Sequence, residues 1–335
     1  MNVLATVTIP RLEVGLAFDA IVDWLTEKFG FLFDGIGTVV EWAVTLLANF
    51  LATPVIFGLA LIFGVLGFAL RGWKIGVAAL VAGLVFGQVA ALLGVPPAIV
   101  LALTFGVIGL ALRGWKFGVF TLAAFILIES MDLWADTMDT IALVIVASLA
   151  AVGLAIPIGI AAARSAAVSK VVRPVLDVMQ TLPAFVYLIP AIFLFGVGVV
   201  PGAVATLIFA MAPGVRLTEL GIRQVDSEVV EAGEAFGASP AKVLLRIQLP
   251  LALPTIMAGI NQVIMLALSM VVIAGMVGAG GLGGAVYTAI SSAQIGPGFE
   301  AGVAVVVVAI YLDRLTAALT SRSAVVRAQA AASDR

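Results

Sequence analysis

The sequence has 335 residues, of which 63% are hydrophobic and 11% are charged, and its mean hydropathy is +1.25. A soluble domain is roughly 45–50% apolar and about 25% charged, so one soluble core could not bury this much apolar surface. The composition excludes a soluble enzyme, and it excludes disorder, which requires low hydrophobicity and high charge. The net charge of −2 gives no indication of nucleic-acid binding. The chain is therefore predicted to be an all-α, polytopic membrane protein.

Cysteine and histidine are both absent from the sequence. The lack of cysteine removes disulfides, thiolate nucleophiles and cysteine-based zinc sites from consideration. The lack of histidine removes the commonest general base and the commonest metal ligand. We therefore expect neither a catalytic residue nor a metal ligand in this chain.

Nine apolar stretches suit membrane-crossing helices, which need roughly 17–25 mostly apolar residues. Short breaks that contain charges, glycine or proline separate most of them. The stretches lie near residues 54–70, 75–93, 97–112, 117–131, 140–163, 175–197, 203–221, 252–279 and 299–313. The sequence thus predicts about nine transmembrane helices.

The N-terminal stretch 12–50 has a different pattern. Asp19, Asp23 and Glu27 recur every four residues, and apolar side chains occupy the opposite face. This pattern is typical of an amphipathic helix that lies at the membrane surface. Residues 36–53 are more apolar but include one glutamate, and a charge at mid-bilayer is costly. An interfacial helix is the main interpretation, and a tenth span at 36–53 is the alternative.

Lysine and arginine set the orientation because they favour short cytoplasmic loops. Basic loops fall at 71–74, 113–116, 164–173 and 223–246, and an even number of predicted spans separates each loop from the next. The loop 129–139 has four acidic residues and no basic residue, so it belongs on the opposite side. The N-terminus is then outside, and the C-terminus is cytoplasmic.

An internal repeat occurs among the first spans. Residues 59–77 match residues 101–119 at 15 of 19 positions, with an offset of 42 residues. Inverted repeats form the transport site in many secondary transporters. Here both copies cross in the same direction and end in Arg-Gly-Trp-Lys, so we interpret the repeat as a tandem duplication of a peripheral helix pair.

These patterns divide the chain into four regions. Residues 1–53 are an extracytoplasmic or interfacial amphipathic segment, and residues 54–131 are peripheral transmembrane helices with the duplication. Residues 132–320 are the core domain, which includes a long cytoplasmic loop at 223–251. Residues 321–335 are a cytoplasmic tail.

The cytoplasmic loop at 223–251 predicts two short helices joined by a corner. Asp226 or Ser227 can cap the first helix, since their side-chain oxygens accept backbone N–H groups. Gly237 suits the end of that helix because glycine enters the left-handed region freely. A helix pair of this kind, held off the membrane, would form a docking surface for a cytoplasmic partner.

The second short helix has its own start and stop signals. Ser239 and Pro240 are a typical beginning, with serine as the cap and proline at the first helical position. Pro250 and Pro254 are expected to break this helix before the next span, because proline has no N–H to donate.

The same loop carries a motif at fixed spacing. It reads Glu231-Ala232-Gly233, then Gly237, and then Ile247-Gln248-Leu249-Pro250. This motif resembles the coupling loop of ABC importer permeases, which reads Glu-Ala-Ala, a glycine, and Ile-x-Leu-Pro. The resemblance implies that the loop sits in a cleft of an ATP-hydrolysing subunit, where Glu231, Ala232 and Gly237 make or shape the contact. Gly233 replaces the second alanine of the family, which loosens the first helix by up to ~1 kcal/mol.

Three further segments, 176–199, 209–225 and 264–283, resemble the permease subunit of glycine betaine/proline betaine/choline-type importers. That family includes importers of carnitine and trimethylamine N-oxide, and the similarity covers roughly residues 95–320. It implies a type I ABC importer permease fold in the bacterial cytoplasmic (inner) membrane. It also implies an assembly of two copies of this chain, two ABC ATPase subunits and an extracytoplasmic substrate-binding protein in membrane lipid.

ATP hydrolysis belongs to another subunit on this interpretation. The sequence contains no Walker A motif, G-x-x-x-x-G-K-[ST]. The resemblance assigns Mg-ATP to the partner ATPase, so this chain is expected to hold no cofactor and to act as a translocation subunit rather than an enzyme.

Two other functions stay open at this point. One is an ABC permease for another small osmolyte or an amino acid. The other is an ion-coupled secondary transporter, which would need no ATPase. The predicted spans lack the paired buried charges that a proton or sodium relay requires, and this counts against the second alternative.

Polar and aromatic residues near the inner half of one span are candidates for the substrate pathway. Asp177 and Gln180 lie one turn apart, and Phe185 and Tyr187 follow. Aromatic faces bind quaternary ammonium ions, and Asp177 could attract such a cation near the inner exit. The alternative is that Asp177 caps the helix beside Arg173 and that the aromatic rings serve only in packing.

A second group of candidates lies in the predicted span 252–279. Asn261 and Ser269 are eight residues apart on one helix face. They contact substrate or, on the alternative, form hydrogen bonds between helices or across a dimer seam. The glycine-rich run 275–284 is either an outer hinge or a close-packed turn.

Overall fold

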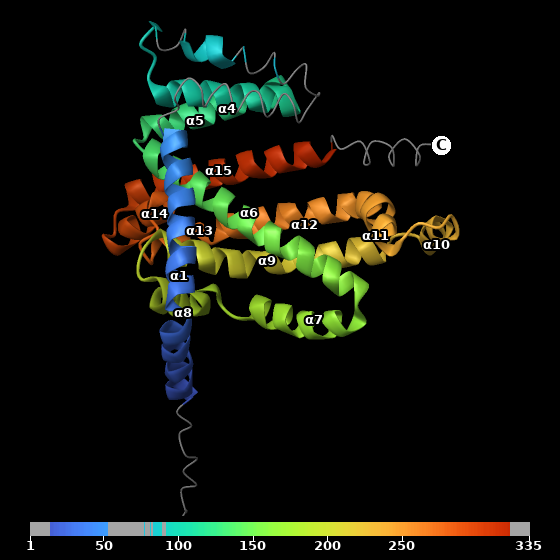
Figure 1. Ribbon diagram of the computed structural model, residues 1–335. Coiled ribbons are helices and arrows are strands. Elements are labelled where there is room, and N and C mark those ends of the chain that lie inside the picture. Colours follow the sequence, from blue (N-terminus) through green and yellow to red (C-terminus); the bar gives the residue numbers. More distant parts are fainter. Residues whose placement is uncertain (1–13, 53–76, 78–80, 82, 89–91, 322–335) are drawn as a thin grey trace, which may run out of the picture.

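The computed structural model describes residues 14–52, 77, 81, 83–88 and 92–321. Within these ranges the chain is helical and has no strand, as the composition predicts. Most of the long helices have roughly aligned axes and form a bundle, and α1 lies across these axes (Figure 1). The helices are α1 (Val14–Ala52), α4 (Pro97–Arg113), α5 (Trp115–Ser130), α6 (Trp134–Arg164), α7 (Ala166–Thr181), α8 (Ala184–Phe195), α9 (Val199–Arg223), α10 (Ser227–Ala235), α11 (Pro240–Val243), the π-helical turn η1 (Leu244–Gln248), α12 (Leu249–Ser269), α13 (Val271–Gly275), α14 (Gly281–Ser291) and α15 (Ile295–Ser321).

Helices α6, α9 and α12 form the centre of the bundle and pack closely through small residues. A Cβ atom at Gly214 of α9 would lie 2.9 Å from the Cβ atom of Ala155 in α6 and 3.0 Å from Val263 of α12. Gly259 of α12 faces Leu217 of α9 at a similar distance. Small residues let membrane helices approach until their backbones are in van der Waals contact. Helix α9 is therefore held between two neighbours along its length.

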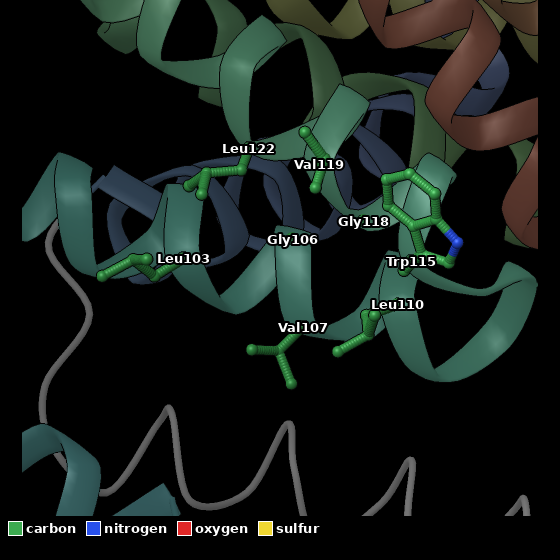
Figure 2. A pocket seen from close by; sticks show the side chains of 8 residues that line it. All are labelled: Leu103, Gly106, Val107, Leu110, Trp115, Gly118, Val119 and Leu122. Carbon is green, nitrogen blue, oxygen red and sulfur yellow. The ribbon is translucent and has the colours of Figure 1, made fainter.

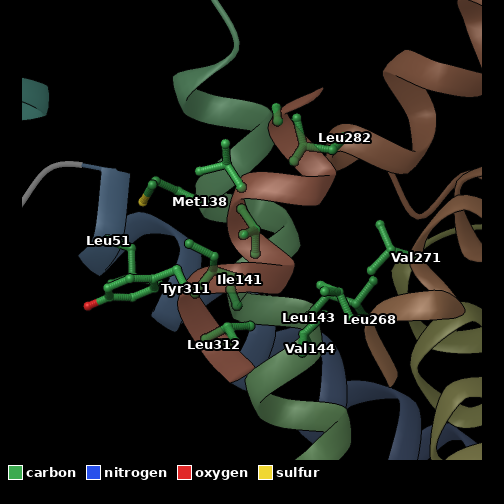
Figure 3. Close-up of a cluster of buried hydrophobic side chains, with 14 of the residues drawn as sticks. Leu51, Met138, Ile141, Leu143, Val144, Leu268, Val271, Leu282, Tyr311 and Leu312 are labelled. Atoms are coloured by element: carbon green, nitrogen blue, oxygen red, sulfur yellow. The ribbon is translucent and has the colours of Figure 1, made fainter. Parts of the chain in front are cut away.

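A large cluster of buried apolar side chains joins α6 to helices from both ends of the chain. Leu51 of α1 and Tyr311 of α15 lie with Met138 and Ile141 of α6 in this cluster (Figure 3). The ring of Tyr311 also packs edge-on against Phe125 of α5, with ring centroids 5.3 Å apart. The N-terminal helix and the core domain thus share one apolar core.

The glycine-rich run 275–284 forms a close-packed turn between α13 and α14. A Cβ atom at Gly283 would lie 2.0 Å from the backbone oxygen of Val271, and one at Gly275 would lie 2.2 Å from the backbone of Gly283. Gly278 adopts a φ angle of +85°, which side chains disfavour. Of the two interpretations of this run, the packing favours a close-packed turn.

Within the described residues, five helices are long and apolar enough to cross a membrane, or six if the bent pair α7–α8 is one span. The stretch 175–197 is not straight: α7 and α8 meet at 100° next to Pro183, one of the two prolines that are expected to kink this span. Proline has no N–H to continue the helix, and it holds the preceding residue in an extended conformation.

The count of nine spans is not confirmed. The stretches 97–112 and 117–131 form α4 and α5, which have 17 and 16 residues. These lengths are at or just below the lower limit for crossing a bilayer. The stretch 54–70 lies outside the described residues, and the stretch 75–93 is described only in part.

Helix α1 is continuous over 39 residues and covers almost all of the stretch 12–50. It runs across the direction of α9 and α12 and packs against α6, α8 and α9 (Figure 1). Its part Asp19–Leu51 is long and apolar enough to span a membrane. Only 11% of the most apolar segment of this part is buried against the protein. Most of its surface therefore faces away from the protein.

Helices α4 and α5 form a tight hairpin that holds the second copy of the repeat. The two helices meet at Gly114, whose φ angle is +91°. A Cβ atom at Gly118 of α5 would lie 2.8 Å from the Cβ atom of Leu110 in α4, so the helices touch. The hairpin carries an apolar pocket of about 210 Å³ (Figure 2), lined by Leu103, Gly106, Val107, Leu110, Trp115, Gly118, Val119 and Leu122. The first copy, 59–77, lies outside the described residues except for Val77.

Candidate functional site

The cytoplasmic loop folds as two short helices with a corner, as predicted. The side chain of Asp226 caps α10 and accepts the backbone N–H of Glu228 at 2.9 Å. After α10, the N–H of Ala238 bonds to the carbonyl oxygen of Gly233 and the N–H of Gly237 bonds to that of Glu234. This pair of bonds, with a φ angle of +81° at Gly237, is the Schellman helix stop. Both ends of α10 are thus fixed by local hydrogen bonds.

The second short helix begins at Pro240, after Ser239, as predicted, but it does not end at Pro250 or Pro254. Helix α11 continues through η1 into α12, and the whole run from Pro240 to Gly275 counts as one apolar helix. The turn of η1 closes with the N–H of Leu249 bonded to the carbonyl oxygen of Leu244, five residues earlier. Pro250 then falls in the first turn of α12, where a missing N–H costs little.

The motif residues divide into an exposed group and a packed group. Glu231, Ala232 and Gly237 are exposed, and α10 has no buried residue. Gly233, Ile247, Leu249 and Pro250 are half-buried, and a Cβ atom at Gly233 would lie 2.5 Å from Cδ1 of Ile247. The two halves of the motif therefore pack against each other and leave the outer face of α10 free.

Sequence reasoning missed the most exposed apolar side chain of this loop. Phe236, the residue that ends α10, is 93% exposed. Val229 on α10 and Leu245 on η1 are also exposed. Apolar side chains on an exposed helix end are typical of a surface that another protein covers. The signal was present in the sequence as a phenylalanine in an otherwise charged and small-residue segment.

A buried carboxylate near the end of α9 was also missed. Glu219 is 3% exposed, and its Oε1 atom accepts hydrogen bonds from Ser169 at 2.8 Å and from Arg173 and Arg223 at 2.9 Å. Arg223 also donates to the backbone oxygen of Ala162 at 2.7 Å. A buried charge is tolerated only when it is paired and hydrogen-bonded. The expectation that the spans hold no paired buried charge is therefore wrong.

A second ion pair lies beside this carboxylate. Asp177 of α7 accepts a hydrogen bond from Arg216 of α9. Asp177 does not cap a helix, because α7 begins at Ala166 and Ser165 is its cap. The two ion pairs line a polar pocket of about 330 Å³, whose walls are Arg173, Asp177, Arg216, Glu219, Leu220 and Arg223. The sequence signal was the spacing of Arg216, Glu219 and Arg223, which places three charges on one face of an apolar helix.

The structure does not bring the predicted pathway residues of α7 and α8 into one group. Gln180 is exposed on α7, and Phe185 is half exposed on α8. Tyr187 is buried, its hydroxyl donates to the backbone oxygen of Met179, and its ring lies 6.5 Å from that of Phe209. Phe185 and Tyr187 therefore cannot contact one cation together within this chain.

The two candidates on α12 have different surroundings. Asn261 is half-buried, donates to Asp313 at 3.4 Å and accepts a hydrogen bond from Thr316, so it links α12 to α15. Ser269 is exposed, and its hydroxyl donates to the backbone oxygen of Met265. The contacts of Asn261 fit the structural alternative, in which polar groups bond between helices.

The sequence of this chain is similar to those of known transport proteins. Residues 155–325 match the family of the binding-protein-dependent transport system inner membrane component. The chain is 52% identical over 321 residues to the glycine betaine/carnitine transport permease protein GbuB of Listeria monocytogenes, which covers 94% of this chain and 98% of GbuB. It is 44% identical over 308 residues to the glycine betaine transport system permease protein OpuAB of Bacillus subtilis, with coverage of 92% and 94%. A solved chain of the inward-facing MetNI methionine ABC transporter matches 54% of this chain and 92% of its own length, at 20% identity and a TM-score of 0.49.

The chain therefore belongs to the family of inner-membrane components of binding-protein-dependent transport systems. It is an integral inner-membrane permease of an ABC transporter, similar over nearly its whole length to permeases of glycine betaine transport systems. Permeases of this family are translocation subunits rather than enzymes.

Proposed function

We propose that this chain is the permease subunit of an ATP-driven importer for glycine betaine and related methylated amines. The working unit contains two copies of the chain, two ABC ATPase subunits that bind Mg-ATP, and an extracytoplasmic substrate-binding protein. The relatives GbuB and OpuAB, which carry glycine betaine in their names, support this substrate class. ATP binding closes the ATPases, draws the two coupling loops together and turns the permease from inward-open to outward-open.

One observation carries the proposal: α10 is an exposed helix whose two ends are fixed. The Asp226 cap and the Schellman stop at Gly237 fix its two ends through local hydrogen bonds. Gly233 and Ile247 fix its inner face, and Phe236 extends from its end. A stiff element of this kind can transmit force from a partner, whereas a flexible loop could not.

The proposed topology places α10 in the cytoplasm and α1 along the outer surface of the membrane. Figure 1 supports this arrangement, because α10 and the end of α15 lie on one side of the bundle, and α1 crosses nearer the opposite side. The nine crossings are then the stretches 54–70 and 75–93, followed by α4, α5, α6, the pair α7–α8, α9, the run α11–α13 and α15. The N-terminus is outside and the C-terminus is cytoplasmic.

Substrate passes the polar and aromatic residues of α7, α8 and α12 on this proposal. Asp177, Gln180 and Phe185 are exposed on the chain, as residues of a pathway between two copies would be. Ser269 on α12 is exposed in the same way. Phe185 supplies an aromatic face, which attracts a quaternary ammonium ion through the ring quadrupole.

The test is ATP hydrolysis in lipid nanodiscs that hold this chain with its ATPase and binding protein. The compounds are glycine betaine, choline, carnitine, trimethylamine N-oxide, proline and histidine. We expect a methylated amine to stimulate hydrolysis and a Gly237→Val variant, which strains the positive φ angle, to lose the stimulation. Failure to form a complex, or equal stimulation in the variant, contradicts the role of the loop. Stimulation by proline or histidine alone contradicts the substrate class.

A further inference from the structure

We propose that Glu219 is a positioning residue that joins the coupling loop to the bent helix pair α7–α8, so that these elements move as one body. The inference rests on the proposed function, because it assigns the route by which motion of α10 reaches the membrane helices. It goes beyond that function in naming the joint and the residues that form it.

The first observation is that hydrogen bonds of Glu219 and its partner Arg223 connect three helices. Oε1 of Glu219, on α9, accepts from Ser169 and Arg173 of α7 and from Arg223 of α9. The same Arg223 bonds to the carbonyl oxygen of Ala162 near the end of α6. The carboxylate is buried while the side chains of Arg173 and Arg223 are partly exposed, and loss of these partners would leave a buried charge unpaired.

The second observation is the position of this carboxylate next to the loop. Helix α9 ends at Arg223 and α10 begins at Ser227, so three residues separate them. The N–H of Gln224 still bonds to the carbonyl oxygen of Leu220, and that of Val225 bonds to Ile222. The connection between α9 and α10 is short and hydrogen-bonded. A displacement of α10 is therefore expected to move the end of α9, which carries Glu219.

The third observation is that α7 has few other attachments to the bundle. Ser169 and Leu176 are its only buried residues, and its contacts are with α6 and α9. Beyond α7 the chain bends by 100° into α8, which packs on α9 and α1. The polar contacts thus hold α7 on α9 together with the packing of Leu176 against Ala212 and Val215, while α8 packs on α9 directly.

The fourth observation is that the charges fix the register of α7 on α9. Arg173 faces Glu219, and Asp177 faces Arg216, so the two helices run antiparallel with opposite charges paired. A slide of one helical turn would place Asp177 against Glu219 or Arg173 against Arg216. Both arrangements bring like charges together, so the charges favour the observed register of α7 on α9.

The first experiment measures how far apart α10 and α8 are in each nucleotide state. The chain has no cysteine, so spin labels can be placed at E228C on α10 and F193C on α8, which are both exposed. We expect the distance between labels within one copy to stay the same with and without ATP in the complete complex. With Glu219→Gln added, we expect the distance to change or to broaden. A wild-type distance that changes with ATP overturns the joint, whatever the substrate is.

The second experiment measures solute transported per ATP hydrolysed in proteoliposomes. Glu219→Gln keeps the shape of the side chain and removes its charge, so we expect complex assembly and basal hydrolysis to persist while the ratio falls roughly tenfold, within the range of typical coupling effects. A proportional loss of transport and hydrolysis, or no loss, contradicts the joint. A wild-type complex that no methylated amine stimulates instead contradicts the proposed function, and the label distances then decide on the joint alone.

A charge exchange at the second ion pair tests the joint independently, in case Glu219→Gln fails to fold. Asp177→Arg and Arg216→Asp each place like charges together, and the double variant restores the pair in reversed order. We expect each single variant to lower the transport-to-ATP ratio and the double variant to regain it. If Asp177 acts by binding the substrate cation, the double variant stays defective, and that outcome contradicts a joint at this pair.

Discussion

Gly233 and Ile247 lie in contact across the corner of the coupling loop, so that a Cβ atom at Gly233 would approach Cδ1 of Ile247 to 2.5 Å. The departure from the Glu-Ala-Ala pattern at Gly233 is thus matched by the side chain opposite it. The cost of glycine in a helix, about 1 kcal/mol relative to alanine, is accepted where a larger residue would press on Ile247.

This contact predicts a dependence between the two positions. Gly233→Ala gains helix propensity but displaces the flexible end of Ile247, so we expect the net change in the free energy of unfolding to stay within ~1 kcal/mol. With Ile247→Val, which removes Cδ1, the alanine fits, and we expect the double variant to be more stable than the two single changes predict. Thermal unfolding of the four proteins in detergent measures the difference. Additive effects would mean that the methyl group of an alanine at this position does not touch the side chain of Ile247.

Gly237 predicts a ranking of variants at the stop of α10. Its φ angle of +81° suits glycine, is tolerated by asparagine, and is strained for a β-branched residue by about 1–2 kcal/mol. We expect substrate-stimulated ATP hydrolysis to be near normal in Gly237→Asn and strongly reduced in Gly237→Val. No heavy atom lies within 4 Å of a Cβ atom at this position, so a loss in Gly237→Val reflects backbone strain. Equal activity of the two variants would show that the helix stop has no part in coupling.

The helices of the coupling loop and the membrane location can be predicted from patterns that are local in the sequence or from its composition. The two short helices of the loop were predictable because caps, glycine stops and helix-initiating prolines act within a few residues, as at Asp226 and Gly237. The membrane location was predictable from composition alone.

Contacts between distant segments were not predictable in this way. Asp177 pairs with Arg216, 39 residues later, and Ser169 reaches Glu219, 50 residues later. The spacing of Arg216, Glu219 and Arg223 marks a charged face on an apolar helix, but nothing local tells which residues of α7 pair with it. The continuation of the helix through Pro250 was missed for a related reason, since the π-helical turn before it absorbs the missing N–H. Pro183 indicates a kink in the stretch 175–197, but it does not give the angle of 100° between α7 and α8.

The turn between α13 and α14 predicts a severe packing defect. Gly283→Ala would place a Cβ atom 2.0 Å from the backbone oxygen of Val271, and backbone cannot move aside as a side-chain end can. We expect destabilisation at or above the usual range for overpacking, about 3 kcal/mol or more, or failure to fold. Gly284→Ala is the matched control, since no atom lies within 4 Å of its Cβ position. Yield and monodispersity after detergent extraction measure the difference, and equal behaviour would contradict the close approach.

Phe236 predicts a docking contact that can be separated from stability. Its side chain is 93% exposed, so Phe236→Ser removes no contact within the chain, and we expect unchanged thermal unfolding of the isolated permease. If the partner ATPase buries this ring, its loss weakens association by about 2 kcal/mol, the lower limit of an aromatic hot spot, or roughly 30-fold in Kd. Titration of the ATPase onto the permease in nanodiscs measures the affinity. Ile295→Ser is the control, because Ile295 is 89% exposed at the start of α15, away from the coupling loop, and should leave the affinity unchanged. An equal loss in both variants, or a loss in neither, would place the ATPase contact elsewhere on the loop.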